Sequence, residues 1–356
     1  MKHFRFNCAA LVIILWVALG TQIHASGAAL SDRIDVTDGF GNRVILDHSP
    51  QKVACLYAFS GHVVTMLGRG RDMAAIVNGL KKDVMLRQLV PGIKKIPVPA
   101  KGGIINIEAL LNTGCDFVFL KPETAKIQAE IKKLERFSLP YYVAGYNSMA
   151  GQMKTIESMG KILGCFEKAR AYTGYYRDTI ERVRNRTRQI PQRERVRLYH
   201  SVNEPTRTDG PNTIEADWTS VCGVINVSVG ESLKEKDNKH FAGMEQILLW
   251  NPEVIIVNQE GVDEMIRTHD KWSAIQAVKD NRVYGIPVGI SRWGHPGGLE
   301  TPLAILWTAK TVYPGLFQDL DLRSEIKTFY HRYFDLTLDN AMVDKILANQ
   351  GMRLRK

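Results

Sequence analysis

Apolar and polar residues follow a helical rhythm most clearly between Phe166 and about Arg188. Apolar side chains recur there at three- and four-residue steps, and the other positions are mostly Lys, Arg, Asp and Glu. Gly164 ends the preceding helical pattern and Pro191 closes this one, so the pattern predicts an amphipathic helix roughly 35 Å long. Between two similar chain halves such a helix is a rigid strut, and the alternative is one more surface helix of a single α/β domain.

Short apolar runs alternate with helical patterns on both sides of this helix, which is typical of α/β folds with parallel sheets. A β-hairpin is expected around Gly39 and Gly41, and a helical tail near the C-terminus. Buried strands are expected at 52–57, 73–77, 116–120, 141–145, 195–202, 253–257 and 282–287. The predicted parts are an N-terminal lobe over 29–165, a connecting helix over 166–188, a C-terminal lobe over 190–320 and a tail over 321–356.

Two segments of the chain repeat each other, Asn106–Leu120 and Gly243–Val257, and they align without a gap. Each passes from a short helix into an apolar strand. Each also carries a Glu in the first helical turn, Glu108 in the first segment and Glu245 in the second. The helix dipole favours a carboxylate at this position, so helix capping alone is a sufficient explanation for both residues. The repeat predicts two lobes of the same design, one on each side of the long helix.

The first residues have the layout of a secretory signal. Lys2 and Arg5 precede an apolar run from Cys8 to Gly20, which is shorter than the about 20 residues needed to cross a bilayer. Small residues follow the run. We therefore expect a signal peptide over 1–25, cleaved near residues 25 to 28, and an exported mature protein.

The charge balance is basic, with 47 Lys and Arg against 37 Asp and Glu in 356 residues, but the cations are scattered. No basic cluster interleaved with aromatic residues occurs, so we expect no nucleic-acid partner and infer an anionic ligand or an acidic surface nearby. The wide spacing of the cysteines favours buried free thiols over disulfides at Cys55, Cys115, Cys165 and Cys222.

Common enzyme motifs are missing from the sequence, since no G-x-S-x-G, P-loop, G-x-G-x-x-G after a strand or H-E-x-x-H occurs. We therefore do not expect an enzyme. A secreted hydrolase is the alternative from another class, because carboxylates and histidines do occur near the predicted loops. A chelatase of similar two-lobe build is a third candidate, and the signal sequence argues against it.

The chain resembles the periplasmic substrate-binding proteins of ABC importers for siderophores, haem, cobalamin and related metal chelates. The matching segments are KVACLYAFSGHVVTMLGRGRDMAAIV from Lys52, the two repeat segments, KILGCFEKARAY from Lys161, and RWGHPGGLETPLAILWTAKTVYPGLF from Arg292. The resemblance implies an α/β fold of two Rossmann-like lobes with parallel sheets, joined by one long rigid α-helix. It also implies a monomer in the periplasm that works with the membrane permease subunits of an ABC importer.

In this family a surface Glu on each lobe meets Arg residues of the permease, and by position these are Glu108 and Glu245. Charge pairs of this kind set orientation and association rate more than affinity. Cys115 departs from the family pattern, which usually has Pro there, as the second repeat does at Pro252. The resemblance thus implies a docking role for the two repeated Glu residues.

Ligands of open α/β sheets bind beyond the carboxyl ends of the strands, so the loops after the predicted strands supply the candidate residues. The expected ligand-binding residues are Tyr57, Phe59, His62, Lys121, Tyr146, Arg207, Asn258, Arg292, Trp293 and His295. The strongest local signal is SRWGHPGG, which puts a guanidinium, an indole and an imidazole on one Gly-rich loop. The simpler explanation is that Trp293 packs on its own lobe and His295 is a turn residue.

We expect a ferric siderophore or related metal chelate as the transported ligand, and no permanently bound cofactor. A naked metal ion is less expected, because the histidines are far apart in sequence and no Cys/His cluster occurs, although His295 completing the coordination of a partly chelated metal stays open. Nickel, haem, cobalamin and oxyanions also stay open as ligands, since the fold does not choose among them.

Overall fold

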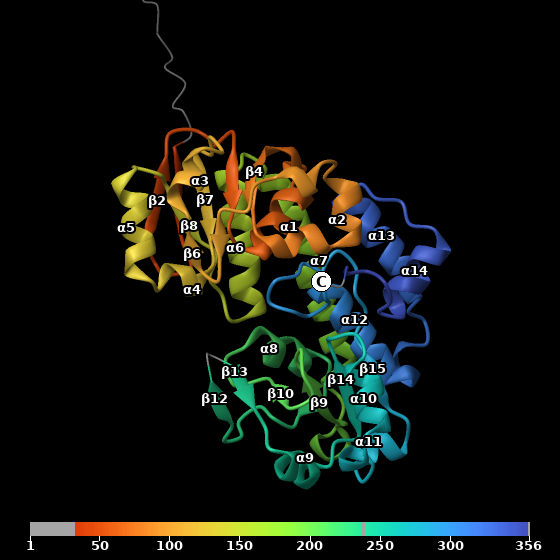
Figure 1. Ribbon diagram of the computed structural model, residues 1–356. Coiled ribbons are helices and arrows are strands. Elements are labelled where there is room, and N and C mark those ends of the chain that lie inside the picture. Colours follow the sequence, from red (N-terminus) through yellow and green to blue (C-terminus); the bar gives the residue numbers. More distant parts are fainter. Residues whose placement is uncertain (1–32, 237–238, 355–356) are drawn as a thin grey trace, which may run out of the picture.

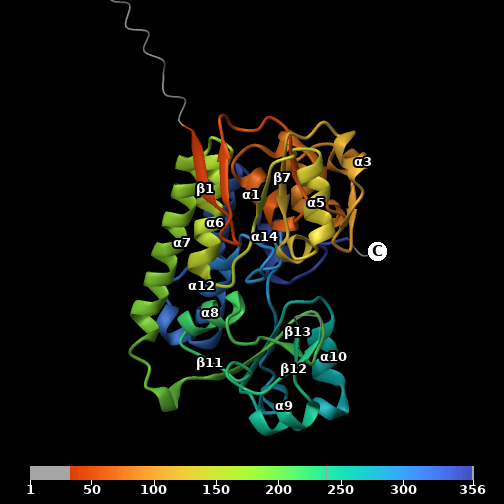
Figure 2. The same cartoon turned by 90° about the vertical axis from the view of Figure 1, so that its left-hand side faces the viewer.

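The computed structural model describes residues 33–236 and 239–354, so the predicted signal peptide over 1–25 lies outside the described residues. Two α/β lobes are stacked one above the other in Figure 1. The helix predicted at 166–188 is α7 (Phe166–Thr187), and Figure 2 shows it running along one side of the molecule from one lobe to the other. The predicted fold class, two lobes joined by one long helix, is confirmed.

The N-terminal lobe is built on a four-stranded parallel sheet in the order β4-β3-β7-β8. Its strands, with those of two small hairpins, are β1 (Ile34–Thr37), β2 (Arg43–Leu46), β3 (Val53–Cys55), β4 (Met73–Ile76), β5 (Ala100–Lys101), β6 (Ile104–Ile105), β7 (Phe117–Leu120) and β8 (Tyr141–Val143). Its helices are α1 (Ala58–Met66), α2 (Val84–Leu89), α3 (Ile107–Leu111), α4 (Pro122–Ala125), α5 (Gln128–Arg136) and α6 (Met149–Ile162). The hairpin and all four parallel strands lie where the sequence predicts them.

The C-terminal lobe repeats this plan with a parallel sheet in the order β11-β9-β14-β15. Its strands are β9 (Arg197–Ser201), β10 (Arg207–Thr208), β11 (Ile225–Asn226), β12 (Lys234–Lys236), β13 (Lys239–Phe241), β14 (Val254–Val257) and β15 (Val283–Gly285). The helices that follow α7 are α8 (Ile214–Val221), α9 (Met244–Trp250), α10 (Val262–Thr268), α11 (Gln276–Lys279), α12 (Thr301–Val312), α13 (Leu322–Phe334) and α14 (Asn340–Leu347).

The repeated segments occupy the same place in the two sheets. The first forms α3 and β7, the second forms α9 and β14, and each strand is third in the order of its sheet. The carboxylate before each strand makes a matched hydrogen bond to the start of the neighbouring strand: Asp116 accepts from the backbone of Lys52 at 3.0 Å, and Glu253 accepts from that of Arg197 at 2.9 Å. The predicted two-lobe repeat therefore extends to individual contacts.

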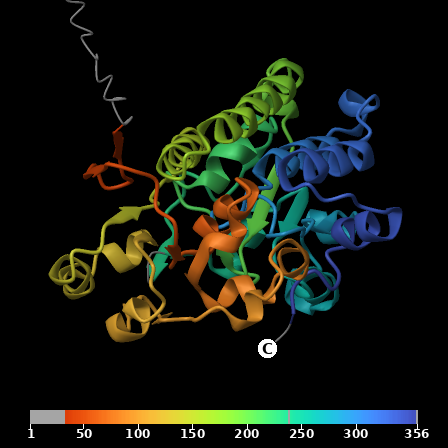
Figure 3. The same cartoon turned by 90° about the horizontal axis from the view of Figure 1, so that it is seen from above.

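The C-terminal tail packs against the strut through aromatic rings, and in Figure 3 the blue helices of the tail lie to the right of the yellow-green α7. The ring centroids of Tyr172 and Tyr333 are 5.3 Å apart, and those of Tyr175 and Phe329 are 5.9 Å apart. Each such pair contributes about 0.5–1.5 kcal/mol beyond its buried area. The tail is therefore part of the folded body, as its amphipathic pattern predicts.

Two further features of the described residues bear on the sequence predictions. No helix in this part of the chain is long and apolar enough to span a membrane. The four cysteines of this part are free thiols, and burial raises the pKa of Cys55 to about 12. Such a thiol stays protonated at neutral pH and packs as a small apolar side chain.

Candidate functional site

The segment Ser291–Gly298, called the site loop below, is held in one shape by buried groups of its own lobe. Glu300 is fully buried and accepts hydrogen bonds from the backbone of Ser291 at 2.9 Å and from the Tyr330 hydroxyl at 3.1 Å. Gly294 has a φ of +68°, and a Cβ there would lie 2.8 Å from the Trp218 indole. Only glycine adopts this φ without strain and also leaves room for the indole, so this backbone conformation is built into the loop before any ligand binds.

The site loop also bonds to the N-terminal lobe. The hydroxyls of Tyr57 and Tyr146 both donate to the carbonyl oxygen of Pro296, the first at 3.4 Å. The Nδ1 of His62 donates to the carbonyl oxygen of Gly297 at 2.8 Å. Tyr57 follows β3 and Tyr146 follows β8, so the carboxyl ends of two parallel strands deliver these rings to the loop.

Arg292 and His295 form the polar centre of the site loop. Arg292 donates to the side-chain oxygen of Asn203 and, at 3.4 Å, to that of Gln259, and both acceptors follow strands of the C-terminal sheet. The Nδ1 of His295 accepts from the backbone of Gly297 at 3.0 Å. A neutral imidazole that accepts at Nδ1 carries its proton on Nε2, so this nitrogen is a donor.

Two donors therefore face each other in the site loop. The Nε2 of His295 lies 3.4 Å from a terminal nitrogen of Arg292, and neither can accept a hydrogen bond from the other. Burial first, and then the charges of Arg292 and Arg207, hold the pKa of His295 well below its ordinary value, so the ring is neutral at pH 7. An acceptor-only group placed at this pair satisfies both donors.

Cationic groups dominate the electrostatic surroundings of this pair, and the carboxyls of Asp83 and Glu215 oppose them. Burial, followed by the charges of Arg353 and Arg207, lowers the pKa of Arg292 to about 10, which leaves its guanidinium charged at neutral pH. Within the described residues the guanidinium of Arg207 makes no hydrogen bond or ion pair. Arg207, Arg292 and His295 each keep part of their surface accessible to solvent. The group can therefore receive a ligand of negative charge.

Four of the predicted ligand-binding residues are buried and do not line an accessible surface: Phe59, His62, Asn258 and Trp293. Direct ligand contact by Trp293 is wrong for this conformation, because its indole is fully buried in the hydrophobic core that includes α12 and α13. Phe59 packs its ring 4.9 Å from that of Tyr146, and Asn258 accepts from the backbone of Asn203 at 2.7 Å. These residues position the side chains that are exposed.

Lys121 lines a pocket of about 630 Å³ whose walls include no residue of the site loop. This pocket opens where β3, β4 and β7 end, and its walls include Tyr57, Asn78 and Gly103. Lys121 is ion-paired with Glu123 at 3.3 Å. Tyr57 touches both this pocket and Pro296 of the site loop, so the two features are neighbours.

The two predicted docking residues are exposed. Glu108 and Glu245 each lie in the first turn of a short helix, α3 and α9, and these helices sit in different lobes toward opposite ends of the molecule (Figure 1). Their positions match across the repeat. Their docking role stays a prediction.

Sequence reasoning missed two charged residues that stand behind the site loop, Asp83 and Arg353. Asp83 is buried and contacts His62 at 3.0 Å and Arg353 at 2.9 Å. No sequence motif indicates these two residues, because they are far apart in the sequence and each is far along the sequence from the site loop. In the part of the chain that the structure describes, no group of three or more His, Cys, Asp or Glu side chains is placed to hold a metal ion.

The sequence matches the model of a known protein family. The family model for periplasmic binding proteins matches residues 53–288, which is more than half of the chain. The chain belongs to the periplasmic binding protein family. This match confirms the family that the sequence resemblance implies. A lipoprotein of Bacillus subtilis named as an ABC transporter substrate-binding protein is 20% identical over 80% of this chain and 87% of its own length.

Curated relatives and solved structures match over most of the chain. The molybdate-binding protein MolA of Haemophilus influenzae is 24% identical over 87% of this chain and 93% of its own length. The solved structure of MolA bound to molybdate has a TM-score of 0.75 at 21% identity, covering 86% of this chain and 99% of that one. CeuE of Helicobacter pylori with nickel and histidine has a TM-score of 0.73 at 19% identity, covering 88% and 99%. At these identities the structures show the shared fold, and their named ligands differ.

Proposed function

We propose that the protein is the substrate-binding subunit of an ABC importer and that its cargo is a small oxyanion of the molybdate type. The observation that carries this proposal is the donor pair of Arg292 and His295, 3.4 Å apart and unable to satisfy each other. A tetrahedral oxyanion offers only acceptor oxygens and negative charge, which is what this pair lacks.

The surrounding charges support an anion over a neutral ligand. Arg207 and Arg292 are both cationic at neutral pH, and hydrogen bonds to charged groups contribute about 1.5–3 kcal/mol each. Asn203 and Gln259 hold the Arg292 guanidinium in place from the side, so less rotamer entropy is lost when the anion binds. The similarity to MolA, a protein named for molybdate binding, agrees with this charge pattern.

A ferric siderophore, the ligand expected from the sequence, is the second candidate. The observation that favours it is the pocket of about 630 Å³ beside Tyr57 and Lys121, which is large enough for part of an organic chelator. An anionic chelate would also satisfy the donors of Arg292 and His295. The two candidates therefore share the cationic centre and differ in whether the neighbouring pocket is filled.

A calorimetric titration panel separates these candidates. The mature protein is titrated at low ionic strength with molybdate, tungstate, sulfate, a ferric trihydroxamate, a ferric catecholate, nickel with histidine, haem and cobalamin. We expect molybdate and tungstate to bind one to one at micromolar or lower dissociation constants, and no product to form. Saturation by a ferric chelate alone would move the assignment to the second candidate, and saturation only by nickel, haem or cobalamin would contradict both.

A further inference from the structure

The last described residues form a strap, Gly351–Leu354, that crosses from the tail to the N-terminal lobe. The backbone of Val84 donates to the carbonyl of Met352 at 3.1 Å, and the backbone of Leu354 donates to that of Lys82 at 3.0 Å. Met352 is buried. Figure 1 shows α13 and α14 beside α2 of the N-terminal lobe, so the tail returns to the lobe in which the chain begins.

This strap fixes Arg353 at a buried carboxylate. Arg353 pairs with Asp83 in an isolated antiparallel bridge, and its guanidinium lies 2.9 Å from the Asp83 carboxylate. Only 1% of the Asp83 side chain is exposed, against 34% for Arg353. A buried carboxylate needs such a partner, because an unpaired charge in this setting is costly.

Asp83 connects Arg353 to the site loop through His62. The Nε2 of His62 lies 3.0 Å from Asp83, and its Nδ1 lies 2.8 Å from the carbonyl oxygen of Gly297. Both partners accept, so both ring nitrogens donate and the imidazole is positively charged. Burial is the largest single influence and lowers the pKa of His62, but the hydrogen bond and charge of Asp83, the charge of Glu300 and the hydrogen bond to Gly297 together raise it more, so the net shift is upward.

The charges of this chain of contacts do not cancel. Arg353 and His62 carry two positive charges and Asp83 carries one negative charge, so these three groups keep one net positive charge, which the buried carboxyl of Glu300 opposes. The same Gly297 that accepts from His62 donates to His295 at 3.0 Å, so the chain ends at the donor pair. Arg353 and Arg207 act together on the Arg292 guanidinium, which places the strap within electrostatic reach of it.

We propose that Arg353, which the C-terminal strap delivers, is a positioning residue of the anion site that acts mainly through its charge, linked to the site loop by Asp83 and His62. The proposal rests on the proposed function, since it assigns Arg353 to the same anion. It gives the tail a role in binding as well as in stability. Among the described residues, Arg353 makes no hydrogen bond or ion pair with the site loop itself, so its effect on the anion is through its charge and through Asp83 and His62.

Neutral and charged replacements of Arg353 in the full mature chain test this proposal, with molybdate as the probe. Arg353→Gln and Arg353→Met should each raise the dissociation constant of molybdate about tenfold at low salt. The loss should shrink to less than threefold at 0.5 M salt, because screening removes a charge effect and leaves packing unchanged. Arg353→Lys should stay within threefold of the unmodified protein at both salt concentrations.

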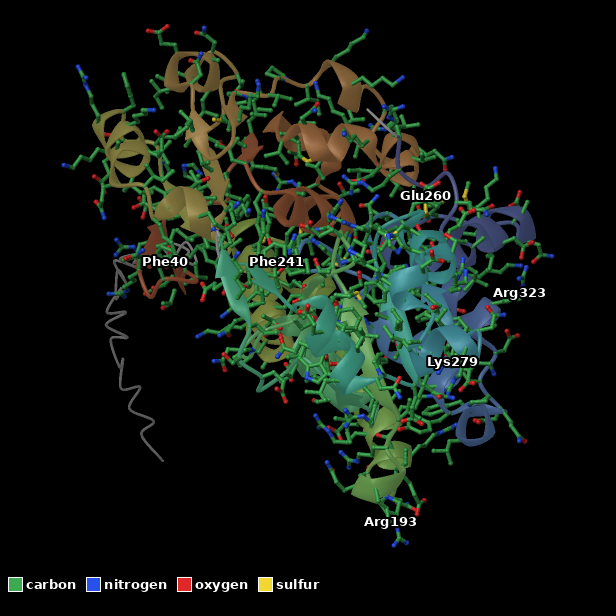
Figure 4. All side chains as sticks on the ribbon, turned by 60° about the horizontal axis from the view of Figure 1, so that its bottom comes forward. Phe40, Arg193, Phe241, Glu260, Lys279 and Arg323 are labelled. Atoms are coloured by element: carbon green, nitrogen blue, oxygen red, sulfur yellow. The ribbon has the colours of Figure 1, made fainter. Side chains whose placement is uncertain are left out.

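The control is Arg323→Gln. Arg323 also belongs to the tail and also pairs with an aspartate, Asp344, at 2.6 Å, but it is exposed and Figure 4 places it on the outer side of the molecule. The Arg323→Gln variant should bind molybdate as tightly as the unmodified protein does. Equal losses in the Arg323 and Arg353 variants, or an Arg353→Gln loss that is unchanged by salt, would overturn the proposal. Failure of the unmodified protein to bind molybdate or tungstate would instead overturn the proposed function, and this inference with it.

Discussion

Arg292→Met is expected to weaken molybdate binding by about 100-fold or more. The substitution removes a charged donor from the pair with His295, and two lost hydrogen bonds of about 1.5 kcal/mol each amount to about that factor. It also leaves the side-chain oxygen of Asn203 without its donor. Because Arg292 remains charged at neutral pH, the loss should be larger at low salt than at high salt. Calorimetric titration of the variant measures it.

Two further variants show whether the guanidinium itself is needed. Arg188→Met removes an exposed cation just beyond α7 and should leave the affinity within twofold. Arg292→Lys keeps the charge and loses the planar fork, so an intermediate loss is expected. Binding of molybdate by Arg292→Met within threefold of the unmodified protein would remove Arg292 from the site.

The double substitution Glu108→Ala with Glu245→Ala is expected to abolish transport while leaving molybdate affinity unchanged. Both carboxylates are exposed, and neither belongs to the site loop or its bonding partners. Charge pairs at a docking surface orient the complex and raise its association rate, so losing one from each lobe removes both anchors. Uptake of molybdate by cells that carry the importer, compared with calorimetric affinity, measures the two effects separately.

The matched control replaces two exposed carboxylates outside the repeat segments, Glu135→Ala with Glu231→Ala. It changes the net charge by the same amount and should leave uptake within twofold. Each single docking variant should keep partial uptake, since one anchor remains. Unchanged uptake in the double docking variant, or a large drop in its ligand affinity, would contradict the docking role.

Much of this architecture follows from patterns within short stretches of sequence. The period of the apolar residues locates α7 within one residue of its observed end, and the repeat places β7 and β14 in equivalent positions of the two sheets. Because the carboxyl ends of parallel strands share one edge, Tyr57 and Tyr146 could be expected near each other without a structure. The Gly-rich pattern of the site loop similarly pointed to Arg292 and His295.

The orientation of side chains within those loops could not be predicted. Phe59 and Trp293 each follow a partly exposed residue in the sequence, but their rings turn into the core, because burial of a large aromatic side chain stabilises the fold more than exposure does. The contact of Asp83 with Arg353 could not be predicted from the sequence either. It pairs residues from opposite ends of the chain through a short bridge, and no local pattern encodes such a pairing.

Binding of an oxyanion between Arg292 and His295 can be seen in a crystal of the protein grown with tungstate. Tungsten scatters anomalously, so its position can be found independently of the protein density. We predict one strong anomalous peak with oxyanion oxygens within hydrogen-bond distance of the Arg292 guanidinium and the Nε2 of His295. A peak in the pocket beside Lys121, or no bound tungsten at saturating tungstate, would contradict the account.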